Sequence, residues 1–119
     1  HALLNEKTRG LINRARLSSM KPGSILINLA RGAIVESLDA LYEVLTDGPL
    51  AAAALDVFEP EPPDVSHPIF KLDNCLTSPH AICMSKRAMY KSFKMMAEDM
   101  AAVLAGRKPQ FVANPEALV

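Results

Sequence analysis

The chain has 119 residues, which is the size of one domain at most. Its 13 basic and 13 acidic side chains give a formal net charge of zero, so no overall field draws it to nucleic acid or to anionic lipid. Half of its residues are hydrophobic, and Cys75 and Cys83 match neither a zinc site nor a disulfide framework. We therefore expect a globular cytoplasmic protein with no metal site, no nucleic-acid partner and no membrane segment.

The first half of the chain predicts a strand, a crossover helix and a second strand. Residues 6–17 are expected to form a short helical or mixed segment. Residues 24–29 are a β-branched apolar run, typical of a parallel strand that is buried on both faces. Residues 36–46 carry leucine and valine at helical spacing, and Gly48-Pro49 ends the helix. Residues 50–57 contain four successive alanines, and only the βαβ context favours a strand there.

The second half predicts a long loop, a short strand and a long helix. Residues 58–72 contain four prolines and cannot form a helix or a central strand. Residues 74–77 fit a third strand, and residues 85–105 fit a helix that Ser85 caps and Gly106 ends. One stripe of this helix is apolar, and we interpret it as core rather than as a cofactor contact: Met89, Phe93, Met96, Met100, Val103 and Leu104.

The order strand, helix, strand, loop, strand indicates an α/β fold, half of a doubly wound parallel sheet. Ligands on such sheets bind beyond the carboxyl ends of the strands. In this chain those ends fall at residues 28–32, 56–61 and 77–80. The candidate functional residues are therefore expected to meet at one edge of the sheet.

Four side chains at that edge suggest chemistry, and each has a structural alternative. Arg31 could grip a carboxylate with two parallel hydrogen bonds, or it is a solvated turn residue. His80 could exchange a proton with a substrate and Glu61 could favour its protonated form, or the two are a structural histidine and a surface carboxylate. Asp56 must meet a donor, either on a cofactor or on a neighbouring backbone. Together they suggest proton-coupled chemistry on a small anionic carbonyl compound.

Four ordered blocks of sequence also carry a family resemblance: H-A-L-L-N-E-K-T-R-G-L-I at 1–12, M-K-P-G-S-I-L-I-N-L-A-R-G-A-I-V at 20–35, A-L-D-V-F-E-P-E-P at 54–62 and L-T-S-P-H at 76–80. The chain resembles the C-terminal part of the NAD-dependent D-2-hydroxyacid dehydrogenases, the family of phosphoglycerate dehydrogenase, glyoxylate/hydroxypyruvate reductase and D-lactate dehydrogenase. The resemblance implies the second half of a Rossmann-like doubly wound parallel sheet, followed by a long C-terminal helix.

The resemblance also implies roles for individual residues. Arg31 would bind the carboxylate and carbonyl of a 2-oxo acid, His80 would protonate the carbonyl oxygen as hydride arrives, and Glu61 would pair with His80. The implied cofactor is NAD, with NADP not excluded, and the implied partner is a small 2-oxo or 2-hydroxy acid. The implied cofactor-binding residues are Ala2 and Leu3 on the adenosine side, and Leu29, Ala30, Arg31, Asp56, His80, Ile82 and Cys83 on the nicotinamide side.

By the same resemblance, residues 1–84 are the C-terminal half of an NAD-binding domain, and residues 85–119 are a helix and tail that return toward a substrate domain. The chain does not begin with Met and contains no G-x-G-x-x-G motif for pyrophosphate. We therefore expect further residues upstream, and we expect these 119 residues alone to expose apolar sheet surface and to be inactive.

The departures from the family pattern are Leu3, where proline is usual, and the segment 81–87, which lacks the commoner small and acidic residues. They leave the substrate acid open. The complete chain is expected to be a homodimer. The alternative function is an NAD-sensing, corepressor-like dimer with a binding rather than a metabolic role, because the same pattern occurs in both groups.

Overall fold

The structure is a computed structural model, and it describes residues 2–118. His1, the first residue of the first block of resemblance, and Val119, the last residue of the expected tail, lie outside the described residues. The chain divides into two compact units, one that ends at Ile82 and one that starts at Cys83. Each unit is described by itself below.

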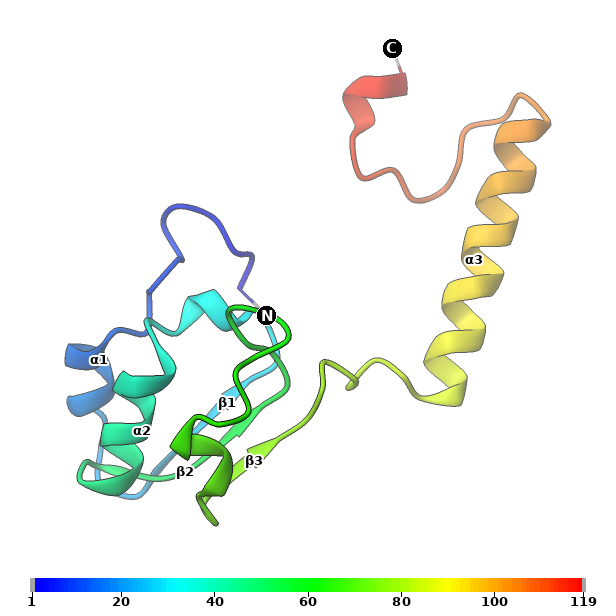
Figure 1. Cartoon of the computed structure of the whole chain (residues 1–119). Helices are drawn as coiled ribbons and strands as arrows, with labels where there is room; N and C mark the ends of the chain where they lie inside the picture. Colours follow the sequence, from blue (N-terminus) through cyan, green and yellow to red (C-terminus); the bar gives the residue numbers. More distant parts are fainter. Residues whose placement is uncertain (1, 119) are drawn as a thin grey trace. The chain divides into compact units, whose positions relative to one another are not determined.

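A parallel three-stranded sheet forms the frame of the first unit. The strands β1 (Ser24–Asn28), β2 (Leu50–Leu55) and β3 (Cys75–Thr77) lie in the order β1-β2-β3. The helix α2 (Leu38–Thr46) connects the first two strands, and the proline-rich loop with the short 3-10 helix η2 (Pro68–Lys71) connects the last two (Figure 1). The α/β class and the parallel sheet predicted from the sequence are confirmed.

Local hydrogen bonds set the ends of the helices in this unit. The Ser37 hydroxyl accepts from the backbone N–H of Ala40, so α2 starts at Leu38 rather than at residue 36 as expected. The first helix, α1 (Arg14–Ser18), is only five residues long and is capped by Asn13. The 6–17 segment is mixed, as expected: residues 6–10 form turns, Ile12 makes an isolated bridge to Val35, and α1 begins at Arg14.

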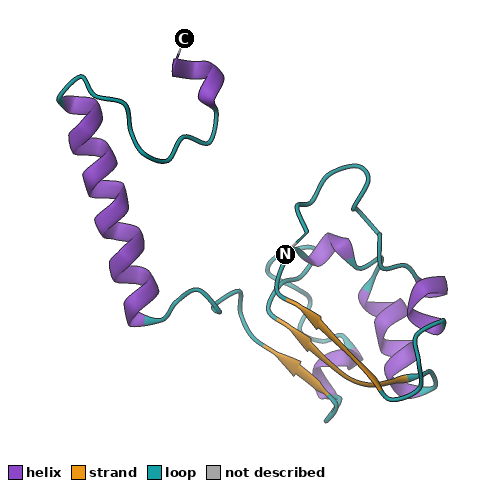
Figure 2. Ribbon diagram, turned by 180° about the vertical axis from the view of Figure 1, so that it is seen from behind, coloured by secondary structure: helices purple, strands orange, loops and turns teal. Residues whose placement is uncertain are grey.

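The core lies on one side of the sheet. The helix α2 packs against β2 and η2, and α1 packs against α2. Leu17, Leu41 and Ile69 are fully buried there. Figure 2 shows α1 and α2 together on the same side of the strands.

The opposite face of the sheet is open in the described part of the chain. Ile25, Ile27 and Leu76 are 62%, 64% and 74% exposed. Ile27, Ala54 and Leu76 share one row across the three strands, so they point to the same side. The expectation that the first strand is buried on both faces is therefore wrong for this unit, because its helices cover only one face. The expectation of exposed apolar sheet surface is confirmed.

The second unit contains the long helix α3 (Lys86–Leu104). The Ser85 hydroxyl accepts from the Ala88 backbone at its start, and Gly106 follows its end with a φ of +70°. The interpretation of its apolar stripe as core is wrong, because Phe93, Met96 and Met100 are each more than half exposed and Ala102 is the residue this helix buries. No helix among residues 2–118 combines the length and the apolar character that a membrane crossing requires.

Candidate active site

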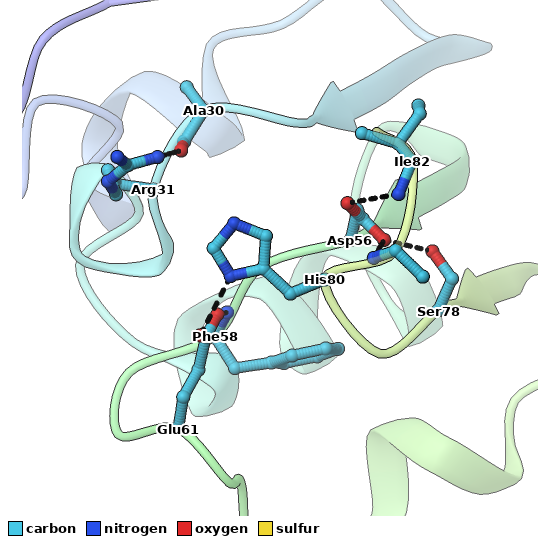
Figure 3. Close-up of polar contacts among 9 residues, drawn as sticks. Ala30, Arg31, Asp56, Phe58, Glu61, Ser78, His80 and Ile82 are labelled. Atoms are coloured by element: carbon cyan, nitrogen blue, oxygen red, sulfur yellow. Dashed lines mark hydrogen bonds and ion pairs between the residues drawn. The ribbon is translucent and has the colours of Figure 1, made fainter. Parts of the chain in front are cut away.

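Three turns meet at the carboxyl edge of the sheet, one after each strand. The turn after β1 carries Arg31, the turn after β2 carries Glu61, and the turn after β3 carries His80 (Figure 3). The parallel topology brings these residues together although 49 positions separate the first from the last.

Glu61 and His80 form a hydrogen-bonded pair. The Nδ1 atom of His80 lies 2.9 Å from Oε2 of Glu61, and the backbone N–H of Phe58 donates to Oε1 of the same carboxylate at 2.9 Å (Figure 3). The hydrogen bond from His80, and then that from Phe58, lower the pKa of Glu61, so its carboxylate stays ionised. An ionised carboxylate accepts, so Nδ1 of His80 carries the proton and Nε2 is left for proton exchange.

The turn that carries Arg31 is held by the side chain of Asn28. The Asn28 amide donates to the Arg31 carbonyl at 2.9 Å, and its oxygen accepts from the Ala30 N–H at 3.1 Å. The Arg31 guanidinium donates through Nη1 to the Ala30 carbonyl at 2.7 Å (Figure 3). A guanidinium has five N–H groups, so donors remain for a ligand.

The turn that carries His80 is held by the side chain of Asp56. Its carboxylate accepts from the Ser78 hydroxyl at 2.6 Å and from the backbone N–H groups of Ala81 at 2.8 Å and Ile82 at 3.1 Å. The hydrogen bond from Ser78 is the largest cause of a lowered pKa for Asp56. His80 has a φ of +53°, a left-handed conformation that costs a non-glycine residue of order 1–3 kcal/mol unless its surroundings hold it.

A cavity of about 220 Å³ joins these groups. Its walls come from all three turns and from the N-terminal segment: Leu4, Arg31, Gly32, Phe58, Glu59, Glu61 and His80. A second, more apolar cavity of about 440 Å³ also touches Glu61 and His80 and is lined among others by Pro62, Val65 and Phe70. Of these two cavities in the described residues, the smaller is the one lined by Arg31 as well as by Glu61 and His80, which makes it the candidate active site.

The close approach of two turns depends on Gly32. A Cβ atom at this position would lie 2.0 Å from the carbonyl carbon of Phe58 and 2.1 Å from its oxygen. Only glycine therefore allows the Arg31 turn to reach the backbone that holds Glu61.

The remaining predicted site residues are more scattered. Leu29 and Ala30 are half-buried in the turn after β1, and Ala2 and Leu3 are exposed in the N-terminal segment. Ile82 contributes its backbone N–H to the Asp56 contact while its side chain is exposed, and Cys83 starts the second unit.

Several residues that shape the site were not singled out from the sequence: Leu4, Asn28, Gly32, Phe58 and Ser78. All but Leu4 lie in the three strand-end ranges that were expected at this edge, so the strand ends were the signal that could have found them.

The described residues fit only the reacting end of a dinucleotide. The cavity has room for a small acid or part of a ring, and it combines an apolar wall with charged groups. The turn after β1 leads into the 3-10 helix η1 (Gly32–Ile34), which is only three residues long. Residues 2–118 therefore show no glycine-rich strand-to-helix turn at which a pyrophosphate would sit on a long helix.

Comparisons with known proteins show the family to which this chain belongs. Residues 1–81 match the family model described as D-isomer specific 2-hydroxyacid dehydrogenase, NAD binding domain. The chain is 41% identical to the glyoxylate reductase of Thermofilum pendens over 118 residues, which is 99% of this chain and 34% of the relative. It therefore spans about a third of the length of that relative.

Two solved structures show the same fold. The D-lactate dehydrogenase of Lactobacillus jensenii, determined with NAD+, matches 95% of this chain and 38% of its own with a TM-score of 0.87 and 27% identity. A D-isomer specific 2-hydroxyacid dehydrogenase of Xanthobacter autotrophicus Py2, determined with NADPH and MES, matches 96% of this chain and 46% of its own with a TM-score of 0.75 and 34% identity. The chain belongs to the D-isomer specific 2-hydroxyacid dehydrogenase family, and its residues 1–81 match the NAD-binding domain of that family.

Proposed function

We propose that this chain carries the catalytic residues of an oxidoreductase that transfers hydride between NAD(H) or NADP(H) and a small D-2-hydroxy or 2-oxo acid. The observation that carries the proposal is the cavity that Arg31 shares with the hydrogen-bonded pair of Glu61 and His80. It supports the proposal because a substrate with both a carboxylate and a carbonyl needs a cation and an acid-base pair within reach of each other.

Each of the three residues has a defined task in this reaction. The Arg31 guanidinium binds the substrate carboxylate with parallel hydrogen bonds. His80 holds a proton on Nε2 and gives it to the carbonyl oxygen in reduction, or takes it from the hydroxyl in oxidation. Glu61 keeps Nδ1 of His80 protonated and stabilises the imidazolium. The nicotinamide cofactor, when bound, supplies or accepts the hydride.

The size of the cavity supports a small substrate. About 220 Å³ is below the usual range for drug-sized ligands, so it suits an acid of a few carbon atoms. Glyoxylate and lactate, the acids in the names of two similar proteins, are of this size. Their difference leaves the particular acid to experiment, and the NAD+ and NADPH complexes of similar proteins leave both cofactors in the proposal.

The test follows NADH and NADPH oxidation at 340 nm with a panel of 2-oxo acids, on the protein expressed from its natural gene. We expect turnover with at least one small acid, and a fall in kcat of roughly two to four orders of magnitude in His80→Ala while NADH binding persists. His67→Ala is the matched control, because Nε2 of His67 also lies 3.0 Å from a carboxylate, that of Asp39, outside the Arg31 cavity.

The outcomes separate the proposal from its alternatives. Full activity in His80→Ala contradicts the assignment of the acid. Equal losses in the two histidine variants indicate loss of folded protein rather than of chemistry. Tight NADH binding without turnover on any acid contradicts the dehydrogenase and favours a cofactor-sensing role.

A further inference from the structure

The first unit buries two polar side chains, Asn28 and Asp56, and both lie at strand ends beside the site. Asn28 is 7% exposed and Asp56 is 1% exposed. They stand on neighbouring strand ends, and the backbone N–H of Asp56 donates to the carbonyl of Asn28 at 3.1 Å. A buried amide or carboxylate is costly unless its hydrogen-bonding groups are satisfied, so these contacts are what the residues do in the fold.

The contacts of Asn28 all fall on the turn that presents Arg31. Its amide group and its carbonyl oxygen bind opposite ends of one short turn, the Arg31 carbonyl and the Ala30 N–H. The Arg31 guanidinium in turn donates to the Ala30 carbonyl, so the side chain is anchored to the backbone that Asn28 fixes. Loss of the Asn28 amide would free the direction in which the guanidinium points.

The contacts of Asp56 all fall on the turn that presents His80. Oδ1 binds Ser78 on one side of His80 and Ala81 on the other, and Oδ2 binds Ile82 (Figure 3). His80 is thus enclosed between partners of one carboxylate, which explains how its left-handed backbone is maintained.

We propose that Asn28 and Asp56 are positioning residues: Asn28 fixes the turn that presents Arg31, and Asp56 fixes the turn that presents His80. The hydrogen bond from the Asp56 backbone N–H to the Asn28 carbonyl joins the two residues. Together they set the distance between the Arg31 guanidinium and the His80 imidazole. The lowered pKa of Asp56 supports this role, because an ionised carboxylate accepts all three hydrogen bonds. The inference rests on the proposed function for the tasks of Arg31 and His80.

The kinetic test separates the two residues by the parameter each one changes. In Asp56→Asn we expect kcat to fall roughly tenfold to a hundredfold with little change in KM for the acid, because His80 is misplaced by a fraction of an ångström to an ångström. In Asn28→Ala we expect KM for the acid to rise roughly tenfold with a smaller change in kcat, because the guanidinium is no longer aimed.

Two matched controls test whether loss of a similar hydrogen bond elsewhere has the same effect. Asp64→Asn makes the same substitution at an exposed carboxylate that accepts from the Ser66 N–H. Asn74→Ala removes an amide that donates to the Leu45 and Ala51 carbonyls before β3. Both controls are expected to keep kcat and KM within about twofold, because surface or remote changes of this kind have small effects.

A second readout does not depend on activity. In low-temperature NMR spectra we expect a downfield signal from the hydrogen-bonded Nδ1 proton of His80, and its loss in Glu61→Gln assigns it to the pair. It should also weaken or vanish in Asp56→Asn and persist in Asp64→Asn. The signal of the Nδ1 proton should weaken in part in Ser78→Ala. It should keep its wild-type intensity in Ser78→Thr, since threonine keeps the hydroxyl that donates to Asp56.

The outcomes decide the proposal. If Asp56→Asn keeps the Nδ1 proton of His80 and the wild-type kcat, Asp56 does not position His80 and the proposal is wrong. If Asp56→Asn does not fold, the Nδ1 proton of His80 and kcat are compared in Ser78→Ala and Ser78→Thr instead. If the wild-type protein reduces no 2-oxo acid, the proposed function fails, whereas the NMR comparison still decides whether Asp56 positions His80.

Discussion

Replacement of Gly32 by alanine tests whether close contact between two turns sets the geometry of the site. The added Cβ would lie 2.0 Å from the Phe58 carbonyl carbon, about 1.4 Å short of an ordinary contact. Both partners are backbone, so one turn must move by about that distance. If the Phe58 turn moves, its backbone N–H moves too, and the 2.9 Å hydrogen bond that it donates to the Glu61 carboxylate is lost.

The expected magnitude follows from that displacement. Overpacking of this kind costs typically about 1–3 kcal/mol of folding free energy, and a misplacement of about 1 Å can lower catalysis roughly a hundredfold. Gly48→Ala is the matched control, since its Cβ would also meet backbone, 2.6 Å from the Val44 Cα, at the end of α2.

The assay measures urea unfolding and kcat/KM for the best 2-oxo acid in both variants. We expect similar losses of stability and a selective loss of kcat/KM in Gly32→Ala. Wild-type kcat/KM in Gly32→Ala, or the same loss in Gly48→Ala, would refute the reasoning.

Four further predictions concern single residues. Arg31→Lys should raise KM for the acid roughly tenfold or more, because one hydrogen bond between charged groups contributes about 1.5–3 kcal/mol, and an unchanged KM would show that Arg31 does not bind the carboxylate. Iodoacetamide should modify exposed Cys83 before Cys75, because burial raises the pKa of the Cys75 thiol. Mass spectrometry of the peptides measures the order, and modification of Cys75 first would contradict this prediction. Ser85→Ala should destabilise α3 by about 1 kcal/mol, whereas Ser85→Asp should keep its stability, as measured by circular dichroism. Equal melting curves in Ser85→Ala and wild type would show that the Ser85 cap does not stabilise α3. Asp56 and Glu61 have lowered pKa values in the fold, so they stabilise it above the ordinary carboxyl pKa of about 4 and this contribution is lost as pH falls; urea unfolding at pH 7 and pH 3 should show a smaller loss in Asp56→Asn than in the wild type.

The sequence was sufficient to predict the frame of the fold and which candidate residues meet at one edge of the sheet. Apolar runs, turn residues and prolines located β1, β3 and the long loop, and the βαβ context located β2, whose alanines are weak strand formers. The rule that parallel strands end at one edge then placed Arg31, Glu61 and His80 near one another, and the structure has them around one cavity. Their catalytic roles stay predictions until the variants are measured.

The contacts that hold those residues could not be predicted from the sequence. The three hydrogen bonds of Asp56 depend on the left-handed φ of His80, which no residue pattern near His80 indicates. The sequence left Asp56 with a cofactor donor or a backbone donor as alternatives, and the contacts within the chain are with Ser78 and the backbone of Ala81 and Ile82.

The burial of the apolar faces could not be predicted from the spacing of apolar residues either. Alternating and helical spacing of apolar residues shows that Ile25, Ile27 and the stripe of α3 share faces, but it does not show what covers them. In the described units these faces are exposed.

The value of kcat in Glu61→Gln tests the central claim most directly, that Arg31, Glu61 and His80 act as one site. The Glu61 carboxylate lies 2.9 Å from Nδ1 of His80 and accepts a hydrogen bond from it. Glutamine keeps the shape and removes the charge. We expect kcat to fall roughly a hundredfold in Glu61→Gln, with KM for NADH unchanged. A wild-type kcat in Glu61→Gln would contradict the account.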